Sequence, residues 1–302
     1  MALKTGRAEG TASVVIDYQK CTACGLCVAI CKGAPLYMEG KKVKVDQARV
    51  FGCIGCGQCM AVCPRDCITV TGRAFSPEDV IPLPPAAKRA GFDALKNLML
   101  SRRSVRKFKD KPVVRAVIEK IVDAVATAPM GLPPSDVEIL VVDRKEKVRE
   151  FAEDIIAVMA KSKFLFGLAG RTLLRPLFGK IFAETAATFI YPAISYFEEA
   201  LARGEDSLFY GAPLVLYFHA SPYADPVDAQ VAATYAMLAA ESLGLGSCMI
   251  GTPAYFIKYS GKLKEKYGIP PKNNQGIAVI FGHPAVKFRK ALKRSLGGVR
   301  YY

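Results

Sequence analysis

Eight of the ten cysteines in this chain form two matched runs. The runs are Cys21-x2-Cys24-x2-Cys27-x3-Cys31 and Cys53-x2-Cys56-x2-Cys59-x3-Cys63-Pro64. Three thiolates spaced two residues apart can wrap a short loop around one [4Fe–4S] cubane, and the fourth cysteine then starts a helix that carries it toward another cluster. The spacing therefore predicts two [4Fe–4S] clusters and an electron-transfer function.

The predicted ligand sets are crossed between the two runs. One cluster is bound by Cys21, Cys24, Cys27 and Cys63, and the other by Cys53, Cys56, Cys59 and Cys31. Small residues between the ligands let backbone N–H groups approach the cluster sulfides and offset their negative charge. These residues are Gly25, Gly55 and Gly57.

Zinc and disulfides explain the same cysteines less well. A zinc site needs only four thiolates, and it does not require a third cysteine two residues after the second. Disulfides are disfavoured because the first ten residues contain no apolar segment of the kind found in export signals. The two remaining cysteines, Cys67 and Cys248, are expected to be small packing residues.

Composition indicates a two-domain protein of the cytoplasm. The chain has 302 residues, of which 51% are hydrophobic, enough for a sizeable core. The longest uncharged stretch in its apolar middle, Thr185 to Phe197, is too short to span a bilayer and includes Pro192.

The charge balance suggests which partners would be attracted. The net charge is +15, and residues 1–72 contain nine Lys or Arg against five acids. Such a face would steer an acidic donor, for example a separate ferredoxin or flavodoxin. A solvated basic surface without a partner is the alternative. Nucleic-acid binding is not expected, because no recognition motif accompanies the charge.

A proline-rich junction at residues 81–86 divides the chain, which predicts a cysteine domain at 1–80, a stiff linker at 81–92 and a second domain at 93–302. In the second domain, apolar periodicity predicts helices and strands in alternation. The helices are expected near 114–125, 144–161 and 226–243, and the strands at 137–142, 213–220 and 276–281. The predicted fold class is α+β, with a three-layer second domain.

A basic segment opens the second domain. Arg102, Arg103 and Arg106 surround Ser104, and this cluster could neutralise a phosphate and still direct one guanidinium to a carbonyl edge. A solvated basic turn is the alternative for the motif taken alone.

Two resemblances to known families complete these patterns. Residues 10–72 closely resemble the two-cluster bacterial ferredoxins, except that Lys32 stands where a proline often follows the fourth cysteine. Residues 93–302 resemble the FMN-dependent nitroreductase family through four segments in the same order. They are Arg102-Arg-Ser-Val-Arg106, Ala128-Pro-Met-Gly131, Gly244-Leu-Gly-Ser-Cys-Met-Ile-Gly251, and Phe281-Gly-His-Pro284 followed by Lys287 and Arg289.

The nitroreductase resemblance implies FMN as the cofactor and a set of contacts to it. Its first segment would hold the phosphate, the ribityl chain and the N1/O2 edge of the flavin. A backbone N–H of the glycine segment would point at N5, and the basic pair would close on the phosphate. The residues implied are Arg102, Arg103, Ser104, Arg106, Met130, Ile250, Gly251, Lys287 and Arg289.

One departure affects the pyrimidine edge of the flavin. Many relatives have Asn-x-Gln-Pro-Trp after the Ala-Pro turn, whereas this chain has Pro133-Pro134-Ser135-Asp136-Val137. Ser135 is the candidate to replace the missing amide. No catalytic acid is assigned, because the two histidines, His219 and His283, are expected to be structural.

The resulting hypothesis is an iron–sulfur flavoenzyme whose clusters feed FMN, which reduces a small hydrophobic acceptor such as a nitroaromatic, a quinone or an activated alkene. The alternatives are a relay that delivers electrons to another protein and an NAD(P)H-dependent nitroreductase. The resemblance also implies a homodimer. A basic, apolar insert at residues 161–182 could cover the flavin, rest on a membrane surface or form a dimer interface; its glycines and Pro176 argue against one continuous helix.

Overall fold

The computed structural model describes residues 3–302, which form two compact units. The first contains the chain up to Arg89 together with Pro129–Glu138 and Ala220–Asp228. The second contains Ala90–Ala128, Ile139–His219 and Ala229–Tyr302. Two short segments that follow the predicted linker therefore belong to the same compact unit as the cysteine runs.

The first unit consists of short elements around a small core. Strands β1 (Ser13–Ile16) and β4 (Ile68–Thr71) pair antiparallel, and so do β2 (Leu36–Glu39) and β3 (Lys42–Val45). Helices α1 (Leu26–Ile30) and α2 (Gln58–Ala61) each make little more than one turn. Buried apolar residues such as Leu36, Val43 and Val70 pack directly against the cysteines. The thiols are therefore part of the core of this unit.

The segment between β4 and the second unit contains little regular secondary structure. Short 3-10 turns occur at η1 (Pro77–Asp79) and η2 (Ala86–Lys88), and residues 81–95 are exposed. Helix α3 (Phe92–Ser101), which the sequence analysis did not predict, leads to the basic segment at Arg102.

The second unit is built on a four-stranded sheet with the order β5-β6-β8-β7. The strands are β5 (Val137–Asp143), β6 (Leu214–Ala220), β7 (Gly246–Ile250) and β8 (Gln275–Gly282). Three of them were predicted within one residue at each end, whereas β7, which contains the glycine segment, was not predicted as a strand. It pairs antiparallel with β8, with Cys248 opposite Ile280.

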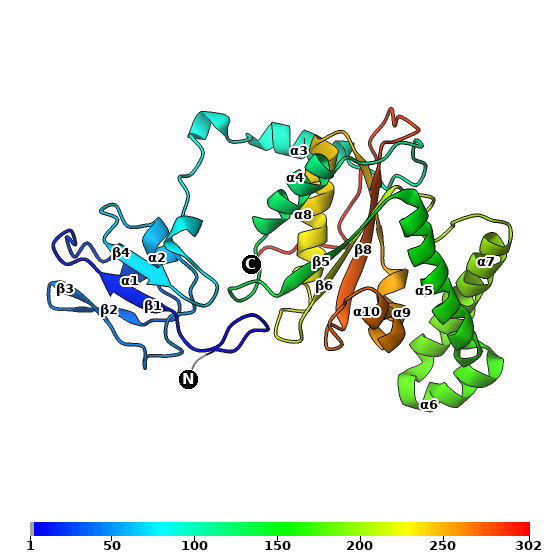
Figure 1. Cartoon of the computed structure of the whole chain (residues 1–302), viewed down its shortest axis with the longest axis horizontal. Helices are drawn as coiled ribbons and strands as arrows, with labels where there is room; N and C mark the ends of the chain where they lie inside the picture. Colours follow the sequence, from blue (N-terminus) through cyan, green and yellow to red (C-terminus); the bar gives the residue numbers. More distant parts are fainter. Residues whose placement is uncertain (1–2) are drawn as a thin grey trace. The chain divides into compact units, whose positions relative to one another are not determined.

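Helices cover both faces of this sheet (Figure 1). Helices α4 (Arg115–Ala126) and α8 (Asp228–Ser242) lie on one side. On the other side lie α5 (Lys145–Phe166), α9 (Thr252–Tyr259) and α10 (Gly261–Lys266). Every residue of β6 is buried, as expected for a strand covered on both faces. This is the three-layer arrangement that the sequence predicts.

Helix α5 is held to the sheet by an apolar cluster. Phe151 is completely buried, stacks on Phe209 with ring centroids 5.6 Å apart, and meets the edge of Tyr267 at 4.6 Å. The same cluster includes Val215 of β6 and Ile257 of α9. Burying one such aromatic side chain stabilises a fold by roughly 1.5–3 kcal/mol.

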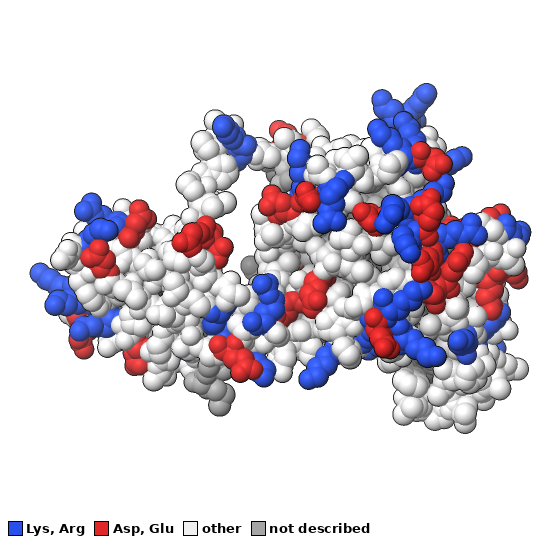
Figure 2. Space-filling model, in the orientation of Figure 1, with Lys and Arg blue, Asp and Glu red and all other residues white. Residues whose placement is uncertain are grey.

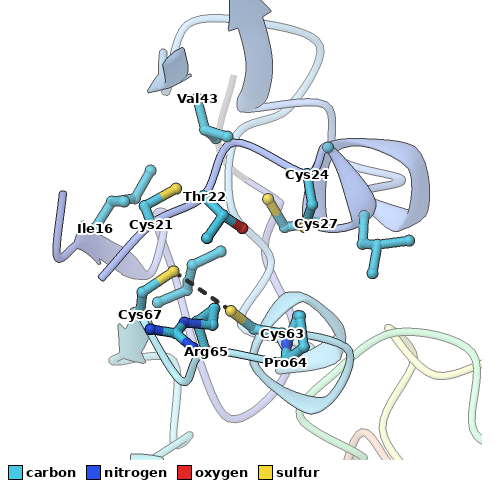
Figure 3. A pocket seen from close by; sticks show the side chains of 13 residues that line it. Ile16, Cys21, Thr22, Cys24, Cys27, Val43, Cys63, Pro64, Arg65 and Cys67 are labelled. Carbon is cyan, nitrogen blue, oxygen red and sulfur yellow. Dashed lines mark hydrogen bonds between the residues drawn. The ribbon is translucent and has the colours of Figure 1, made fainter. Parts of the chain in front are cut away.

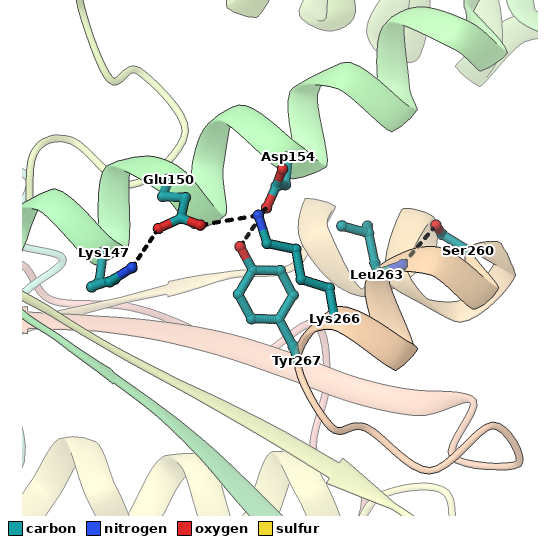
Figure 4. Close-up of polar contacts among 7 residues, drawn as sticks. All are labelled: Lys147, Glu150, Asp154, Ser260, Leu263, Lys266 and Tyr267. Atoms are coloured by element: carbon teal, nitrogen blue, oxygen red, sulfur yellow. Dashed lines mark hydrogen bonds and ion pairs between the residues drawn. The ribbon is translucent and has the colours of Figure 1, made fainter.

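A polar network joins the outer surface of α5 to the end of α10 (Figure 4). Lys266 lies 3.0 Å from a carboxylate oxygen of Glu150 and 2.5 Å from one of Asp154, which also accepts a hydrogen bond from the Tyr267 hydroxyl. Hydrogen bonds from Lys147 and Lys266 lower the pKa of Glu150 to about 2. Because exposed ion pairs contribute only about 0–1 kcal/mol each, the apolar cluster is the stronger tie between these helices.

The predicted insert forms a helical projection between α5 and β6. Its elements are α6 (Leu168–Thr185), the π-helical turn η3 (Ala186–Ile190) and α7 (Tyr191–Ala202). Gly179 inside α6 has φ 81° and ψ 177°, so the insert is not one continuous helix, as predicted. Leu173 and Ile181 on α6 are about four-fifths exposed, at 80% and 81%. Among residues 3–302, no helix is long and apolar enough to cross a membrane.

The packing of α5 leads to a first prediction. Phe151→Ala should lower the free energy of unfolding by about 3–5 kcal/mol, because it removes a buried ring and leaves a cavity. Phe164→Ala is the matched control on the same helix, since Phe164 is 70% exposed; it should change stability by less than about 0.5 kcal/mol. Denaturant unfolding measures both variants, and equal losses would contradict this account of the core.

Candidate functional site

Four cysteines from both runs surround one cavity in the first unit (Figure 3). Cys21, Cys24, Cys27 and Cys63 line it, and about 350 Å³ inside it is free of protein atoms and partly open to solvent. Ile16, Val43 and Ile68 close its apolar side. The first predicted ligand set therefore converges on one site.

The other four cysteines surround a second cavity. Cys31, Cys53, Cys56 and Cys59 line it, around about 370 Å³ of similar space. Each cavity thus takes three thiols from one run and the fourth from the other. Among the described residues, no three His, Cys, Asp or Glu side chains are grouped as ligands of a single metal ion.

The two short helices explain how one run serves both cavities. Cys27 is buried within α1, and Cys31 is the residue at which α1 ends, with extended backbone angles of φ −74° and ψ 102°. A residue four positions along a continuing helix would lie on the same face as Cys27. Cys31, at the end of α1, nevertheless lines the second cavity, so α1 contributes a thiol to each cavity.

Two glycines start these helices in a conformation that other residues rarely adopt. Gly25 before α1 has φ 76°, and Gly57 before α2 has φ 68°. A Cβ atom on Gly57 would also lie 2.4 Å from the ring of Phe75. Both glycines are therefore required by the turns that place the cysteines, in addition to any contact with a bound cluster.

The chemistry of the donors fits iron–sulfur clusters. Burial raises the pKa of Cys27 and Cys53 and raises that of Cys59 to about 12. These groups are neutral thiols unless a metal takes the place of their protons, as in cluster assembly. Thiolates in an apolar, partly closed cavity are the ligands that such clusters use.

Cys67 lies at the first cavity, where the sequence analysis expected only a packing residue. It is buried, as expected of a packing residue, but it also lines the first cavity. Its sulfur lies 3.4 Å from that of Cys63, and Figure 3 shows this contact. Burial, followed by the neighbouring Cys63, raises the pKa of Cys67 to about 12. The first cavity therefore has five thiols in its wall.

The second unit contains a basic cavity where the phosphate of FMN is expected. Arg103, Lys287 and Arg289 line it together with Gly244 and Gly246. The cavity has about 1240 Å³ of space, much of it open to solvent, and its other charged residues are Lys109, Lys290 and Glu241. In Figure 2, Lys and Arg side chains gather on the segment that follows β8. This surplus of positive charge suits a phosphate dianion.

The basic segment and the glycine segment lie side by side. Ser104 forms a parallel bridge with Ser247 of β7, and the N–H of Val105 donates to the carbonyl of Ser247 at 2.9 Å. A Cβ atom on Gly246 would lie 2.6 Å from the Val105 side chain, so glycine is needed for this approach. The Ser247 hydroxyl is buried and has no hydrogen-bond partner in the structure.

The remaining predicted FMN residues of the second unit have defined places. Ile250 is the last residue of β7, and Gly251 is the residue before α9. Arg102 ends α3. The guanidinium of Arg106 lies over the ring of Tyr210, 5.8 Å from its centroid. None of these four lines the basic cavity.

Met130 and Ser135 belong to the first unit. The Ser135 hydroxyl accepts a hydrogen bond from the N–H of Val137 at 3.2 Å, and its carbonyl accepts one from Arg7 at 3.0 Å. The next residue, Asp136, is buried and accepts hydrogen bonds from the Gly6 N–H at 2.7 Å and the Ser221 hydroxyl at 2.9 Å. The segment that departs from the family pattern is therefore bonded to the start of the chain.

The comparisons with known proteins agree with these arrangements. The nitroreductase family model matches residues 99–283, and a 4Fe-4S dicluster domain model matches residues 13–64. The FMN reductase (NAD(P)H) of Bacillus subtilis strain 168 is 27% identical over 195 residues, which are 64% of this chain. The match spans 66% of that relative, just under two thirds of its length.

A solved structure shows the same fold as the nitroreductase part of the chain. This nitroreductase with bound FMN, from Desulfitobacterium hafniense DCB-2, has a TM-score of 0.50 and 20% identity, and the match covers 69% of this chain and 97% of that one. Together with the family models it confirms the predicted fold. This chain belongs to the nitroreductase family and carries a 4Fe-4S dicluster domain ahead of its nitroreductase part.

Proposed function

We propose that the protein is an iron–sulfur flavoprotein oxidoreductase in which two [4Fe–4S] clusters supply FMN, which reduces a small organic acceptor. The observation that carries this proposal is the convergence of four cysteines on each of two cavities. Family membership and the basic cavity of the second unit support FMN as the acceptor of the electrons.

The division of roles follows from the cofactors. Clusters exchange single electrons, whereas FMN exchanges one or two and so converts single electrons into the pair that an organic acceptor needs. Arg103, Lys287 and Arg289 would hold the phosphate, and Gly251 or Ile250 would offer a backbone N–H to the flavin. Arg106 would supply a positive charge that favours the reduced flavin.

A second candidate function differs in the electron donor. The Bacillus subtilis relative is named for NAD(P)H, which favours a nicotinamide as the donor for this chain as well. In that case the clusters would carry electrons away from the flavin or stand outside the main reaction. A low-potential one-electron donor, such as an acidic ferredoxin or flavodoxin, remains our leading choice because the chain has its own cysteine runs and a net charge of +15.

Three further predictions from the sequence remain part of this proposal. They are the homodimer, the cytoplasmic location and the boundaries of the linker at residues 81–92. The exposed apolar side chains of α6 are a suitable cover for a hydrophobic acceptor or a surface for a second copy. The sequence analysis also offered contact of this insert with a membrane surface, and that contact remains a prediction.

The donor can be identified by an anaerobic titration of the visible spectrum. Reduced ferredoxin should bleach the flavin band, and NADH alone should leave it unchanged over the same time. Reduction by NADH at a rate equal to turnover would favour the nicotinamide-dependent function. A purified protein that binds no flavin would overturn the role proposed for the second unit.

The crossed ligand sets predict the effect of removing single cysteines. Wild-type protein should contain about eight iron atoms per chain, and Cys31→Ala and Cys24→Ala should each retain about four. Cys31→Ala should give the same spectrum as Cys56→Ala, because both residues line the second cavity. Cys248→Ala is the control and should keep all the iron, since Cys248 lies in the core of the other unit. A Cys31→Ala spectrum matching that of Cys24→Ala would contradict the crossing.

The basic cavity predicts how FMN binding responds to charge removal. Arg103→Gln should weaken binding roughly 10- to 100-fold, because a hydrogen bond to a charged group contributes about 1.5–3 kcal/mol. Binding of riboflavin, which lacks the phosphate, should change little. Quenching of flavin fluorescence during titration of the flavin-free protein measures both.

Arg115→Gln is the matched control for this measurement. Arg115 is exposed on α4 and pairs with Glu119 at 3.0 Å, away from the cavity residues. Its replacement should leave both affinities unchanged. An equal loss for FMN and riboflavin in Arg103→Gln would mean that Arg103 acts on folding and does not bind the phosphate.

A further inference from the structure

One arginine of the first unit is buried without an acidic partner. Arg73 follows β4 and is 7% exposed. Among residues 3–302, no ion pair joins it to an Asp or Glu, although several exposed Lys residues of the same unit are paired. A buried cation without a counter-charge is rare, because removing it from water costs free energy that nearby dipoles must offset.

Four backbone carbonyl groups offset the charge of Arg73. Its Nε donates to the carbonyl of Ile54 at 3.1 Å, and one terminal nitrogen donates to the carbonyls of Leu3 and Gly10, both at 2.6 Å. The other terminal nitrogen donates to the carbonyl of Pro133 at 3.1 Å. The guanidinium is thus fixed in position while its full positive charge is kept.

This charge lies directly behind the second cavity. Ile54 is between Cys53 and Cys56 in the sequence and lines that cavity with them. A Cβ atom on Gly55 would lie 3.2 Å from the Cβ of Arg73, so the arginine packs against the loop itself. In a poorly hydrated interior, a fixed charge acts on its neighbours with little screening.

The first cavity has no equivalent. Its lining includes Arg65, but Arg65 is exposed and is followed by the exposed Asp66. Water and the neighbouring carboxylate weaken the field of such a side chain. The two cavities therefore have four predicted ligands each and similar size, but they differ in buried charge and in the additional thiol of Cys67 in the first.

We infer that Arg73 raises the reduction potential of the cluster bound by Cys53, Cys56, Cys59 and Cys31 above that of the other cluster. The inference rests on the proposed function, since it requires both clusters. A buried positive charge stabilises the reduced form, which is the more negative one. A single electron from an external one-electron donor then leaves the first cluster oxidised and the second reduced, and the transfer exchanges no proton and breaks no bond.

The same guanidinium also binds a segment that follows the predicted linker. Pro133, whose carbonyl it binds, lies within the residues that match the nitroreductase family model. Through Arg73, the Cys53–Cys56 loop is therefore bonded to a segment of the nitroreductase part within one compact unit. The positive charge of Arg73 favours an electron on the cluster of the second cavity. The Cys53–Cys56 loop of that cavity is the one that Arg73 joins to Pro133.

Redox titration monitored by electron paramagnetic resonance tests the inference. Arg73→Gln should lower the midpoint potential of one cluster by about 59 mV or more, which is a tenfold change in a one-electron equilibrium, and should leave the other cluster unchanged. Arg73→Lys, which keeps the charge, should retain most of the wild-type potential. Arg49→Gln is the matched control, because it removes an exposed arginine that lies over Tyr37 in the same unit.

A second measurement does not depend on the folding of the Arg73 variants. Cys24→Ala protein should retain only the second cluster and Cys56→Ala only the first, and the retained cluster should have the higher potential in Cys24→Ala. Equal potentials, the reverse order or an unchanged potential in Arg73→Gln would overturn the role of Arg73 while leaving the two clusters in place. Wild-type protein with iron for fewer than two clusters would overturn the proposed function as well.

Discussion

The end of α1 at Cys31 is the constraint on which the cysteine domain depends. Eight thiols are divided between two cavities, and each run places three thiols at one cavity and its fourth at the other. Cys31 leaves the helical conformation, and its thiol faces the second cavity. The left-handed glycines before α1 and α2 set the start of each helix.

Burial of the thiols ties folding of the first unit to its cofactors. The core of this unit is small, and the cysteines make up a large part of it. Cys27 and Cys59 are each 7% exposed. A metal that replaces their protons adds binding free energy to a fold whose apolar core is limited. The second unit has a separate and much larger core around Phe151, so its stability does not rest on the same source.

The parts of the fold that the sequence predicted share a strong local pattern. Strands β5, β6 and β8 are nearly continuous apolar segments, and α4 has apolar residues at helical spacing, so burial on one or both faces identified them. Strand β7 was missed because its glycines and Ser247 resemble a loop; only its pairing with β8 makes it a strand. Helix α3 was missed because its residues are largely exposed, so no core pattern marks it.

The two groups of four cysteines could be predicted because ligand spacing is a local property, whereas the proposed flavin site depends on contacts between distant segments. Arg103, Lys287 and Arg289 meet at one cavity although more than 180 residues separate the first from the others. Arg73 shows the limit of sequence reasoning. It stands alone in Gly72-Arg73-Ala74, and its four acceptors are backbone carbonyls, which every residue has. Because the acceptors are backbone atoms, such a contact leaves no recognisable pattern in the side chains of the partner residues.

The insert raises a different physical question, because its exposed surface is both apolar and basic. Phe164, Leu168, Leu173, Leu177 and Ile181 are each at least 70% exposed, and no acidic residue lies between Asp154 and Glu184. In Figure 2 the surface over α6 is largely uncharged, with the basic side chains at its margins. Apolar patches of this kind on a protein mark surfaces that another molecule covers. The break at Gly179 divides α6 into two shorter pieces, so a molecule that covered this surface would meet a bend and positive charge along its edge.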